Sequence, residues 1–290
     1  MSSVYHPGEL AAQAKAGVRD EAERLGGIVR TAVPPAAAEF LAQQRILVLS
    51  ADDAAGSMWA TLLTGRPGFL RAESGTVWVD ARPAPSDPLA ASLAGHTQVG
   101  ALAIDPATRR RMRVNGPVDA VESGLRITVE QAYPNCPKYI QRREPIRESA
   151  VPAPVGAEEL AGLDAAALRV IHTADTFFVG TTAADGRCDA SHRGGNPGFV
   201  HVEPDGTVSW PDYPGNAMMM TLGNLEQNPA AGLLFFEWAT GTTLQLTGRA
   251  EVDWAARQRA VRYRVERAWR TGLASPLRWG APEYSRFNPD

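Results

Sequence analysis

A short polar segment in the second half of the chain, Ser191-His192-Arg193-Gly194-Gly195, brings together groups that can bind and act on a charged ligand. Its hydroxyl and guanidinium groups donate hydrogen bonds to anions, and its glycines let a ligand approach the backbone closely. The segment suits a phosphate or the edge of a ring cofactor. A polar bulge before the strand at Pro197-Gly198-Phe199 is the alternative interpretation.

A row of polar residues occupies alternate positions around residue 112, and its members are Arg109, Arg111, Arg113 and Asn115. Side chains alternate between the two faces of a strand, so Met112 and Val114 would point into a barrel and the polar row would point outward. An outward row of arginines suits a phosphate or a carboxylate. A solvated strand end beside the Asp105-Pro106 turn is the alternative. Arg113 and Asn115 lie farthest from that turn and are the stronger binding candidates.

The segment Tyr133-Pro134-Asn135-Cys136-Pro137-Lys138-Tyr139 ends the first half of the chain. Its two prolines make it rigid, so it would fix the side chains of Asn135, Lys138 and Tyr139 against a ligand or against the other half. No suitable His and acid pattern stands near Cys136. Cys136 is therefore interpreted as a small buried hydrophobe rather than a nucleophile.

A second rigid segment, Pro211-Asp212-Tyr213-Pro214-Gly215-Asn216, precedes an expected short helix. Asn216 and Thr221 would lie near the start of that helix, where backbone N–H groups attract anions. The alternative is that Asn216 is simply a helix cap. His6, His96, His172 and His201 have no metal-ligand spacing, so no metal site is predicted.

The two halves of the sequence repeat one another. Short motifs recur in one order at offsets that grow from 130 to 136 residues, as loop insertions between fixed strands would produce. At an offset of 130, Thr61-Leu62-Leu63 stands opposite Ser191-His192-Arg193, so the candidate chemical groups occur in one copy only. The recurring motifs are Pro67-Gly68-Phe69-Leu70 with Pro197-Gly198-Phe199-Val200, Gly75-Thr76-Val77 with Gly206-Thr207-Val208, Val99-Gly100-Ala101-Leu102 with Ala231-Gly232-Leu233-Leu234, Met112-Arg113-Val114-Asn115-Gly116 with Leu244-Gln245-Leu246-Thr247-Gly248, and Val129-Glu130-Gln131-Ala132-Tyr133 with Val265-Glu266-Arg267-Ala268-Trp269.

Alternation of apolar and polar residues predicts that both halves are mainly β. It is clear in Leu125-Arg126-Ile127-Thr128-Val129-Glu130, and its repeat partner Val261-Arg262-Tyr263-Arg264-Val265-Glu266 is predicted as a strand for the same reason. Turn signals such as Asp185-Gly186 and Asp205-Gly206 separate short strands. The sequence thus predicts two tandem split β-barrels of Greek-key type that arose by internal duplication.

The expected domains are an N-terminal helical arm over residues 1–35, a first split barrel over 36–144 and a second over 157–290. Prolines at 145, 152 and 154 predict an extended linker over residues 145–156. Apolar residues at helical spacing predict an amphipathic helix over residues 10–29. Further helices are expected at 157–173 and at 222–227, the latter ending before Asn228-Pro229.

Composition excludes several classes of function. The net charge of −3 argues against a nucleic-acid partner, and no apolar run reaches the roughly 18 residues of a membrane span. The first residues show neither the basic nor the apolar region of a signal peptide, so a cytoplasmic location is expected. Two cysteines are too few for a disulfide scaffold.

The sequence over residues 177–252 resembles the pyridoxamine 5'-phosphate oxidase superfamily of FMN-binding split barrels. In the first half, three motifs are similar to a bacterial branch of predicted flavin-nucleotide-binding proteins: His6-Pro7-Gly8-Glu9, Arg111-Met112-Arg113-Val114-Asn115-Gly116 and Asn135-Cys136-Pro137-Lys138-Tyr139. The motifs of the second half are Ser191-His192-Arg193-Gly194-Gly195, Pro197-Gly198-Phe199, Pro211-Asp212-Tyr213-Pro214-Gly215-Asn216, Leu222-Gly223-Asn224-Leu225, Asn228-Pro229 and Gly232-Leu233-Leu234-Phe235.

The resemblance implies an FMN-dependent oxidoreductase acting on a small organic molecule, with the cofactor in the groove between two barrels. One chain would supply both barrels, as a pseudo-dimeric monomer or as part of a homodimer. The family's Ser-Arg-Lys triplet for the flavin phosphate is replaced here by Met219-Met220-Thr221, so Arg193 or Lys138 would take its role. An F420-dependent reductase, or a non-catalytic flavin or haem carrier or sensor, remains the alternative.

The predicted site divides into a reacting group and a set of cofactor-binding groups. His192 is expected to be the catalytic residue beside the reacting ring. The expected cofactor-binding residues are Ser191, Arg193, Gly194, Asn216, Thr221, Arg113, Asn115 and Lys138.

Overall fold

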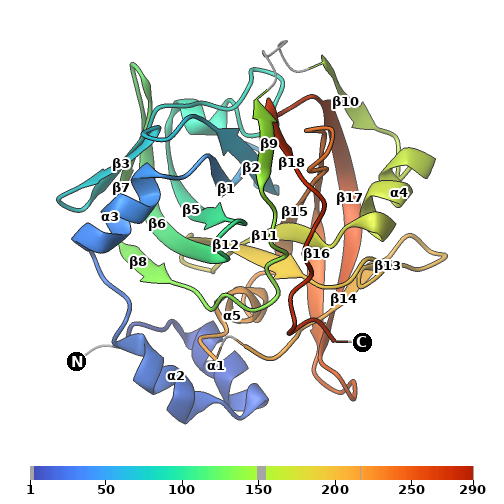
Figure 1. The fold of residues 1–290 in the computed structure, drawn as a ribbon. Helices are drawn as coiled ribbons and strands as arrows, with labels where there is room; N and C mark the ends of the chain where they lie inside the picture. Colours follow the sequence, from blue (N-terminus) through green and yellow to red (C-terminus); the bar gives the residue numbers. More distant parts are fainter. Residues whose placement is uncertain (1–2, 149–154, 216, 290) are drawn as a thin grey trace.

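The computed structural model describes residues 3–148, 155–215 and 217–289. Two β-barrels lie side by side, the first coloured blue to green and the second yellow to red in Figure 1. Two helices, α1 (Pro7–Ala16) and α2 (Arg19–Gly26), lie below them next to α5 (Met220–Leu225). In the part of the chain that the structure describes, no helix has the length and apolar character needed to cross a membrane.

Each barrel is built on an eight-stranded antiparallel sheet. In the first, the path of paired strands runs β2-β1-β5-β6-β7-β4-β3, with β8 paired to β6. The jumps from β1 to β5 and from β7 to β4 are non-local connections of Greek-key type. The strands are β1 (Ile46–Asp52), β2 (Met58–Thr64), β3 (Leu70–Glu73), β4 (Thr76–Val79), β5 (His96–Asp105), β6 (Arg110–Val121), β7 (Gly124–Thr128) and β8 (Gln131–Pro134).

The second sheet repeats the order of the seven strands on this path, and only its eighth strand differs. Its path is β12-β11-β15-β16-β17-β14-β13, with β10 paired to β17, so the predicted duplication and the predicted mainly β fold are confirmed. Its long strand β17 includes Val261 to Glu266, confirming the strand prediction there. The strands are β10 (Val155–Leu160), β11 (Thr176–Thr182), β12 (Cys188–Gly194), β13 (His201–Val202), β14 (Val208–Pro211), β15 (Ala230–Phe236), β16 (Thr243–Asp253) and β17 (Ala260–Gly272).

Helices also occupy matching places in the two copies. Helix α3 (Pro35–Ala42) precedes β1 as α4 (Ala165–Thr173) precedes β11. In the first copy the 3-10 turn η1 (Ser92–Ala94) lies between β4 and β5. In the second copy the helix α5 lies between the corresponding strands, β14 and β15. The helix predicted at 222–227 is therefore present, two residues earlier than expected.

Two of the helix predictions need correction. The expected helix over residues 10–29 is broken into α1 and α2, because Gly17 adopts a left-handed conformation (φ 68°) that ends α1. The expected helix over 157–173 begins only at Ala165. The preceding residues form β10, whose Glu158 and Glu159 form ion pairs with the β17 residues Arg270 and Arg267.

The predicted linker is only partly a free connection. Its first residues form β9 (Pro145–Glu148), which pairs with β18 (Leu277–Trp279) near the C-terminus. Residues 149–154 lie outside the described part of the chain. The linker's first residues are extended, as the prolines predict, but they are held in a two-stranded sheet.

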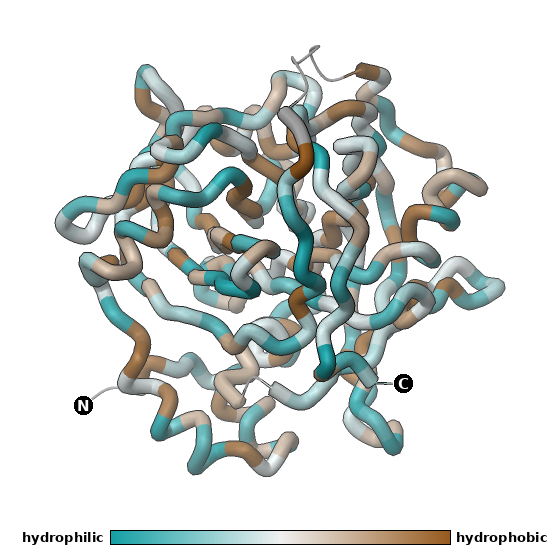
Figure 2. Tube along the Cα trace, in the orientation of Figure 1, coloured by the Kyte–Doolittle hydropathy of each residue, from teal (hydrophilic) through white to brown (hydrophobic). Residues whose placement is uncertain are grey.

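Apolar residues fill both barrels and the space between them. Figure 2 shows hydrophobic (brown) residues mainly toward the interiors and hydrophilic (teal) residues in the outlying loops. One buried cluster combines Ile46, Val48 and Leu102 of the first barrel with Phe178 and Leu234 of the second. The barrels therefore share a continuous apolar interface, as the apolar faces of β1 and β11 require.

Glycines at equivalent positions let the barrels approach each other at the backbone. A Cβ atom on Gly100 of β5 would lie 2.5 Å from the Cα of Asp189 in β12. A Cβ atom on Gly232 of β15 would lie 2.6 Å from the Cα of Trp59 in β2. Real Cβ atoms do not come this close to a backbone, so only glycine allows either crossing.

We expect Gly232→Ala to destabilise the protein by about 2–3 kcal/mol, since the new methyl group forces two backbones apart in a packed interface. Gly162→Ala is the matched control, because nothing lies within 4 Å of a Cβ atom there, and it should change stability by less than about 1 kcal/mol. Urea unfolding of both variants measures the difference. Equal stability of the two variants would show that the barrels do not depend on this close crossing.

Candidate functional site

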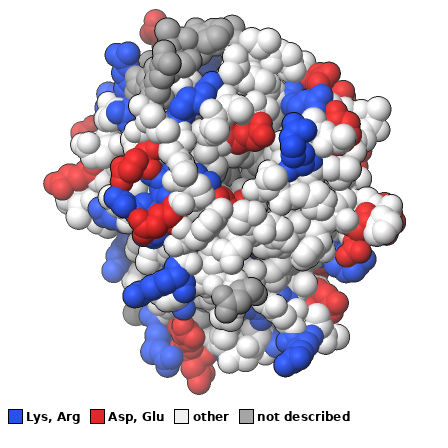
Figure 3. Space-filling view, turned by 45° about the vertical axis from the view of Figure 1, so that its right-hand side comes forward, with Lys and Arg blue, Asp and Glu red and all other residues white. Residues whose placement is uncertain are grey.

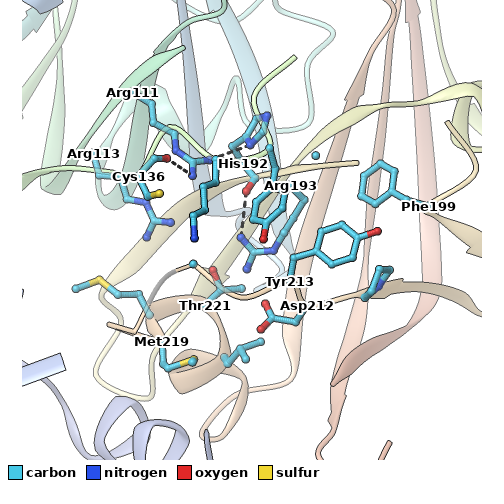
Figure 4. A pocket seen from close by; sticks show the side chains of 17 residues that line it. Arg111, Arg113, Cys136, His192, Arg193, Phe199, Asp212, Tyr213, Met219 and Thr221 are labelled. Carbon is cyan, nitrogen blue, oxygen red and sulfur yellow. Dashed lines mark hydrogen bonds between the residues drawn. The ribbon is translucent and has the colours of Figure 1, made fainter. Parts of the chain in front are cut away.

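A pocket opens at the seam between the two barrels, and both contribute to it (Figure 4). The first barrel supplies β6 and the segment after β8, while the second supplies β12, the end of β14 and α5. The lining residues are Arg111, Arg113, Cys136, Lys138, Tyr139, His192, Arg193, Gly194, Phe199, Pro211, Asp212, Tyr213, Gly215, Met219, Met220, Thr221 and Leu222.

The base of the pocket is a buried ion pair between the barrels. Arg113 of β6 donates from Nη1 to both carboxylate oxygens of Asp189 in β12, at 2.7 and 2.8 Å, and both side chains are only 4% exposed. The same nitrogen lies 3.2 Å from the hydroxyl of Tyr133. Burial alone would lower the pKa of Arg113, but the attraction of the Asp189 carboxylate outweighs it and raises that pKa. Arg113 is therefore charged and firmly held.

Ser191 continues this network toward α5. Its hydroxyl accepts a hydrogen bond from Nη2 of Arg113 at 2.5 Å and lies 2.6 Å from the hydroxyl of Thr221. Ser191 is fully buried and does not line the pocket, whereas Thr221 does. Ser191 thus lies beneath the pocket and positions its floor.

His192 lines the pocket with an imidazole that is almost completely buried. Nη1 of Arg111 lies 2.8 Å from its Nδ1, and because a guanidinium can only donate, Nδ1 is the acceptor and Nε2 carries the proton. Nε2 has no hydrogen-bond partner among the described residues. Burial, followed by the positive charges of Arg111 and Arg193, lowers the pKa of His192 well below its ordinary value. The ring is therefore neutral and offers one unused donor.

Three more cations border the pocket without an acidic partner. Among the described residues, Arg111, Arg193 and Lys138 make no salt bridge. Arg111 donates to the carbonyl of Cys136 at 2.7 Å, and Arg193 donates to the carbonyl of His192 at 3.1 Å (Figure 4). Burial, and then the neighbouring guanidinium groups, lower the pKa of Arg111. Positive charge is thus concentrated here at an electrostatic cost.

The one carboxylate that lines the pocket, Asp212, offsets this charge only in part, since it attracts Arg193 but is itself hydrogen-bonded to Arg259. Asp212 pairs with Arg259, whose Nη2 and Nε lie 2.6 and 2.8 Å from the same carboxylate oxygen. Figure 3 shows that on the outer surface, by contrast, basic and acidic residues are interspersed over the face it displays. Within the described residues no three His, Cys, Asp or Glu side chains are grouped as a metal site. The excess positive charge calls for an anionic ligand.

Two residues of the pocket wall hold an unusual backbone conformation. Tyr139 has φ 64° and Met219 has φ 57°, values that cost non-glycine residues free energy. The hydroxyl of Tyr139 donates to the carbonyl of Pro214 at 2.7 Å, and its ring packs on that of Tyr213 with centroids 5.2 Å apart. These contacts fix the segment that carries Lys138.

The structure places the predicted site residues in three groups. The pocket contains Arg113, Lys138, His192, Arg193, Gly194 and Thr221. Ser191 and Asn115 are buried and do not line it, and Asn115 instead donates to Gln131 at 3.2 Å. Asn216 lies outside the described residues.

Several lining residues were not predicted, and Arg111 is the most important. It stands in the alternating row with Arg113, so the pattern already placed it on the correct face. The row does lie outside the first barrel, but the second barrel covers that face, which corrects the interpretation of Arg113 as part of a solvated edge. Arg109 also has partners, since it donates to the carbonyl of Ile140 at 3.0 Å and to Glu283.

We expect Asp189→Ala to lower the free energy of unfolding by about 3–5 kcal/mol, because Arg113 would be left buried without its counter-ion. Glu159→Ala removes the acid of the exposed pair with Arg267 and should cost less than about 1 kcal/mol. Chemical denaturation of the two variants tests this. Similar losses would mean that the buried pair does not hold the barrels together.

The neutral state of His192 predicts a pH dependence of stability. Below pH 6.5 the unfolded imidazole takes up a proton that the folded one resists, so the contribution of His192 to stability falls as pH falls, by up to about 1.4 kcal/mol per pH unit. His192→Gln lacks this titration. Urea unfolding between pH 5 and pH 7 should therefore show a stability difference between the two proteins that changes with pH. A constant difference would contradict a buried neutral His192.

Comparison with known proteins agrees with this architecture. Residues 163–276 match the family model of pyridoxamine 5'-phosphate oxidase. No protein of curated function matches the sequence.

Similar solved structures include three bacterial proteins. Group A Streptococcus HupZ is 19% identical, covers 40% of this chain and 94% of its own, and has a TM-score of 0.29. The FAD binding protein from Mycobacterium smegmatis is 13% identical, with 40% and 98% covered and a TM-score of 0.28. A Clostridium acetobutylicum protein of the pyridoxinephosphate oxidase family, related to general stress protein 26, is 12% identical, with 39% and 89% covered and a TM-score of 0.27.

The matched region begins just before α4 and ends just before β18, so it includes nearly the whole second barrel. The first barrel has the same strand order as the second. The second barrel therefore matches the pyridoxamine 5'-phosphate oxidase family, and the first barrel repeats its strand order.

Proposed function

We propose that the pocket binds the phosphate of a flavin nucleotide, with FMN as the cofactor. The observation that carries this proposal is the group of three cations, Arg111, Arg193 and Lys138, that face one pocket without an acidic partner among the described residues. Charge-assisted hydrogen bonds from guanidinium groups are well suited to phosphate. A phosphate would offset the burial and the repulsion that together lower the pKa of Arg111.

Unused donors at the same place support the fit to a flavin nucleotide. The Nε atoms of Arg111 and Arg193 and the Nε2 atom of His192 are buried and have no partner among the described residues. Buried polar groups in folded proteins nearly always have a partner, so these three donors indicate a missing acceptor. The oxygen atoms of a phosphate and the polar edge of a flavin ring would satisfy them.

We further propose that the protein is an FMN-dependent oxidoreductase acting on a small organic molecule. The flavin would supply the hydride chemistry, and the chain would orient it and exclude water. Arg193 and Arg111 would hold the phosphate. His192, neutral and with its proton on Nε2, would donate a hydrogen bond at the buried end of the pocket. Because each barrel supplies part of the pocket, one chain would be enough to form it.

The deazaflavin F420 and a non-catalytic role are the second candidates. Met219-Met220-Thr221 stands in place of the Ser-Arg-Lys triplet, so the phosphate would be held by cations from other elements, which leaves room for a different phosphate-bearing ring. A flavin or haem carrier or sensor would use the same pocket without turnover. The absorption spectrum and mass of the small molecule that co-purifies with the protein separate these candidates.

We expect Arg193→Ala to weaken FMN binding about ten- to a hundredfold, because the variant loses one charge-assisted hydrogen bond to an anion. Arg262→Ala is the matched control, because Arg262 is exposed on β17 and does not line the pocket. Titration of FMN followed by quenching of its fluorescence measures both. If the two variants bind FMN equally well, the phosphate does not bind at Arg193.

A further inference from the structure

The internal repeat creates a second groove that is equivalent to the pocket by the duplication. The second groove is formed by β2, β16 and the segment after β17. These are the counterparts of β12, β6 and the segment after β8, which form the pocket. A pocket is present there, and its lining includes Leu62, Leu63, Thr243 and Thr271. The two grooves therefore offer a direct comparison of what each half of the chain can bind.

Strand registers fix which residues of the two grooves correspond. Seven residue pairs join β1 to β2, and seven join β11 to β12, so Leu62 opposite Val48 occupies the place of His192 opposite Phe178. By the same register Leu63 takes the place of Arg193.

The other wall of the groove corresponds in the same way. On β6, Arg113 pairs with Tyr133, and on β16, Gln245 pairs with Trp269. Two residues before these positions, Thr243 on β16 stands at the position of Arg111 on β6. Two arginines of the pocket wall thus become neutral side chains.

We infer that the chain holds one phosphate-binding site, in the groove of His192 and Arg193, and that the equivalent groove no longer binds anions. At the four equivalent positions His and three Arg are replaced by two Leu, Thr and Gln, and none of these bears a charge. This inference rests on the proposed phosphate site. It adds how many such sites the chain has and which of the two grooves forms one.

An acidic side chain also occupies the second groove. Asp87 accepts hydrogen bonds from the hydroxyl of Thr61 at 2.5 Å, from Nε2 of Gln245 at 3.2 Å and from the backbone of Leu89 at 2.9 Å. Thr61 is the counterpart of Ser191, and Gln245 that of Arg113. An acidic group, whose pKa burial raises, thus lies where the pocket presents cations, and it offers a phosphate no positive charge.

Among the residues that the structure describes, Arg82 is the single cation lining this groove, and it is already engaged with the protein. Arg82 donates from Nε to the carbonyl of Gly124 at 3.2 Å and from Nη2 to the carbonyl of Val121. The buried ion pair has no counterpart at this seam, since Trp59 stands at the position of Asp189 and Gln245 at that of Arg113.

Counting the bound FMN tests the inference. Equilibrium dialysis of the full chain at saturating FMN should give one FMN per chain. Arg193→Leu, which copies Leu63, should weaken that binding at least tenfold, while Arg82→Ala, which removes the cation of the other groove, should leave it unchanged. Far-UV circular dichroism of each variant checks that it is folded.

Each outcome decides between the two claims. Two FMN molecules per chain, or an equal loss of affinity in Arg82→Ala, would overturn the single-site inference while leaving a flavin-binding protein. No FMN bound to the wild type would overturn the proposed function, and the single-site inference with it. One FMN that Arg193→Leu still binds at full strength, with its fold intact, would place the site outside this groove.

Discussion

The ion pair between Arg113 and Asp189 is the interaction on which the pocket depends. Removing either charge from water costs several kcal/mol, and that cost is offset only while the two groups remain together. The pair therefore fixes β6 of one barrel against β12 of the other. From it, hydrogen bonds pass through Ser191 to Thr221 and so to α5, the helix that forms the pocket floor.

The N-terminal arm holds the opposite side of that helix. Nε2 of His6 lies 2.8 Å from Oδ1 of Asn224, and Gln13 donates to the carbonyl of Met218 at 3.0 Å. Helices α1 and α5 touch where Gly8 meets Gly223, since a Cβ atom on Gly8 would lie 2.2 Å from the carbonyl oxygen of Gly223. The floor of the pocket is thus held between the barrel seam and the arm.

Periodicity and the repeat predicted most of the fold, because both depend on local patterns. The alternation around Met112 correctly placed the arginines on the face away from the barrel interior. It could not show that a second barrel covers that face, since a period of two identifies a face but not its neighbour. The helix predicted over 157–173 is present only from Ala165, for a related reason. Its Ala and Glu residues favour helix locally, but pairing with β17 makes Glu158 and Glu159 part of an edge strand.

The sequence predicted part of the candidate site. A physical cause separates the residues that it identified from those that it missed. His192 and Arg193 stood out because their repeat partners are leucines, so no structural role shared by both barrels explains them. Ser191 belongs to the same motif and shares a strand face with Arg193, but it is buried against Arg113 and Thr221, and no local pattern shows that these side chains cover it. The depth of Arg111 in the pocket depends on the packing of two barrels, which no local pattern describes.

The position of the phosphate in a crystal structure of the chain with FMN tests the central claim most directly. The account predicts phosphate oxygens in contact with Arg111 and Arg193, in the groove between β6 and β12, with Arg113 still paired to Asp189. A phosphate bound in the groove of Leu62 and Asp87, or away from both seams, would contradict it.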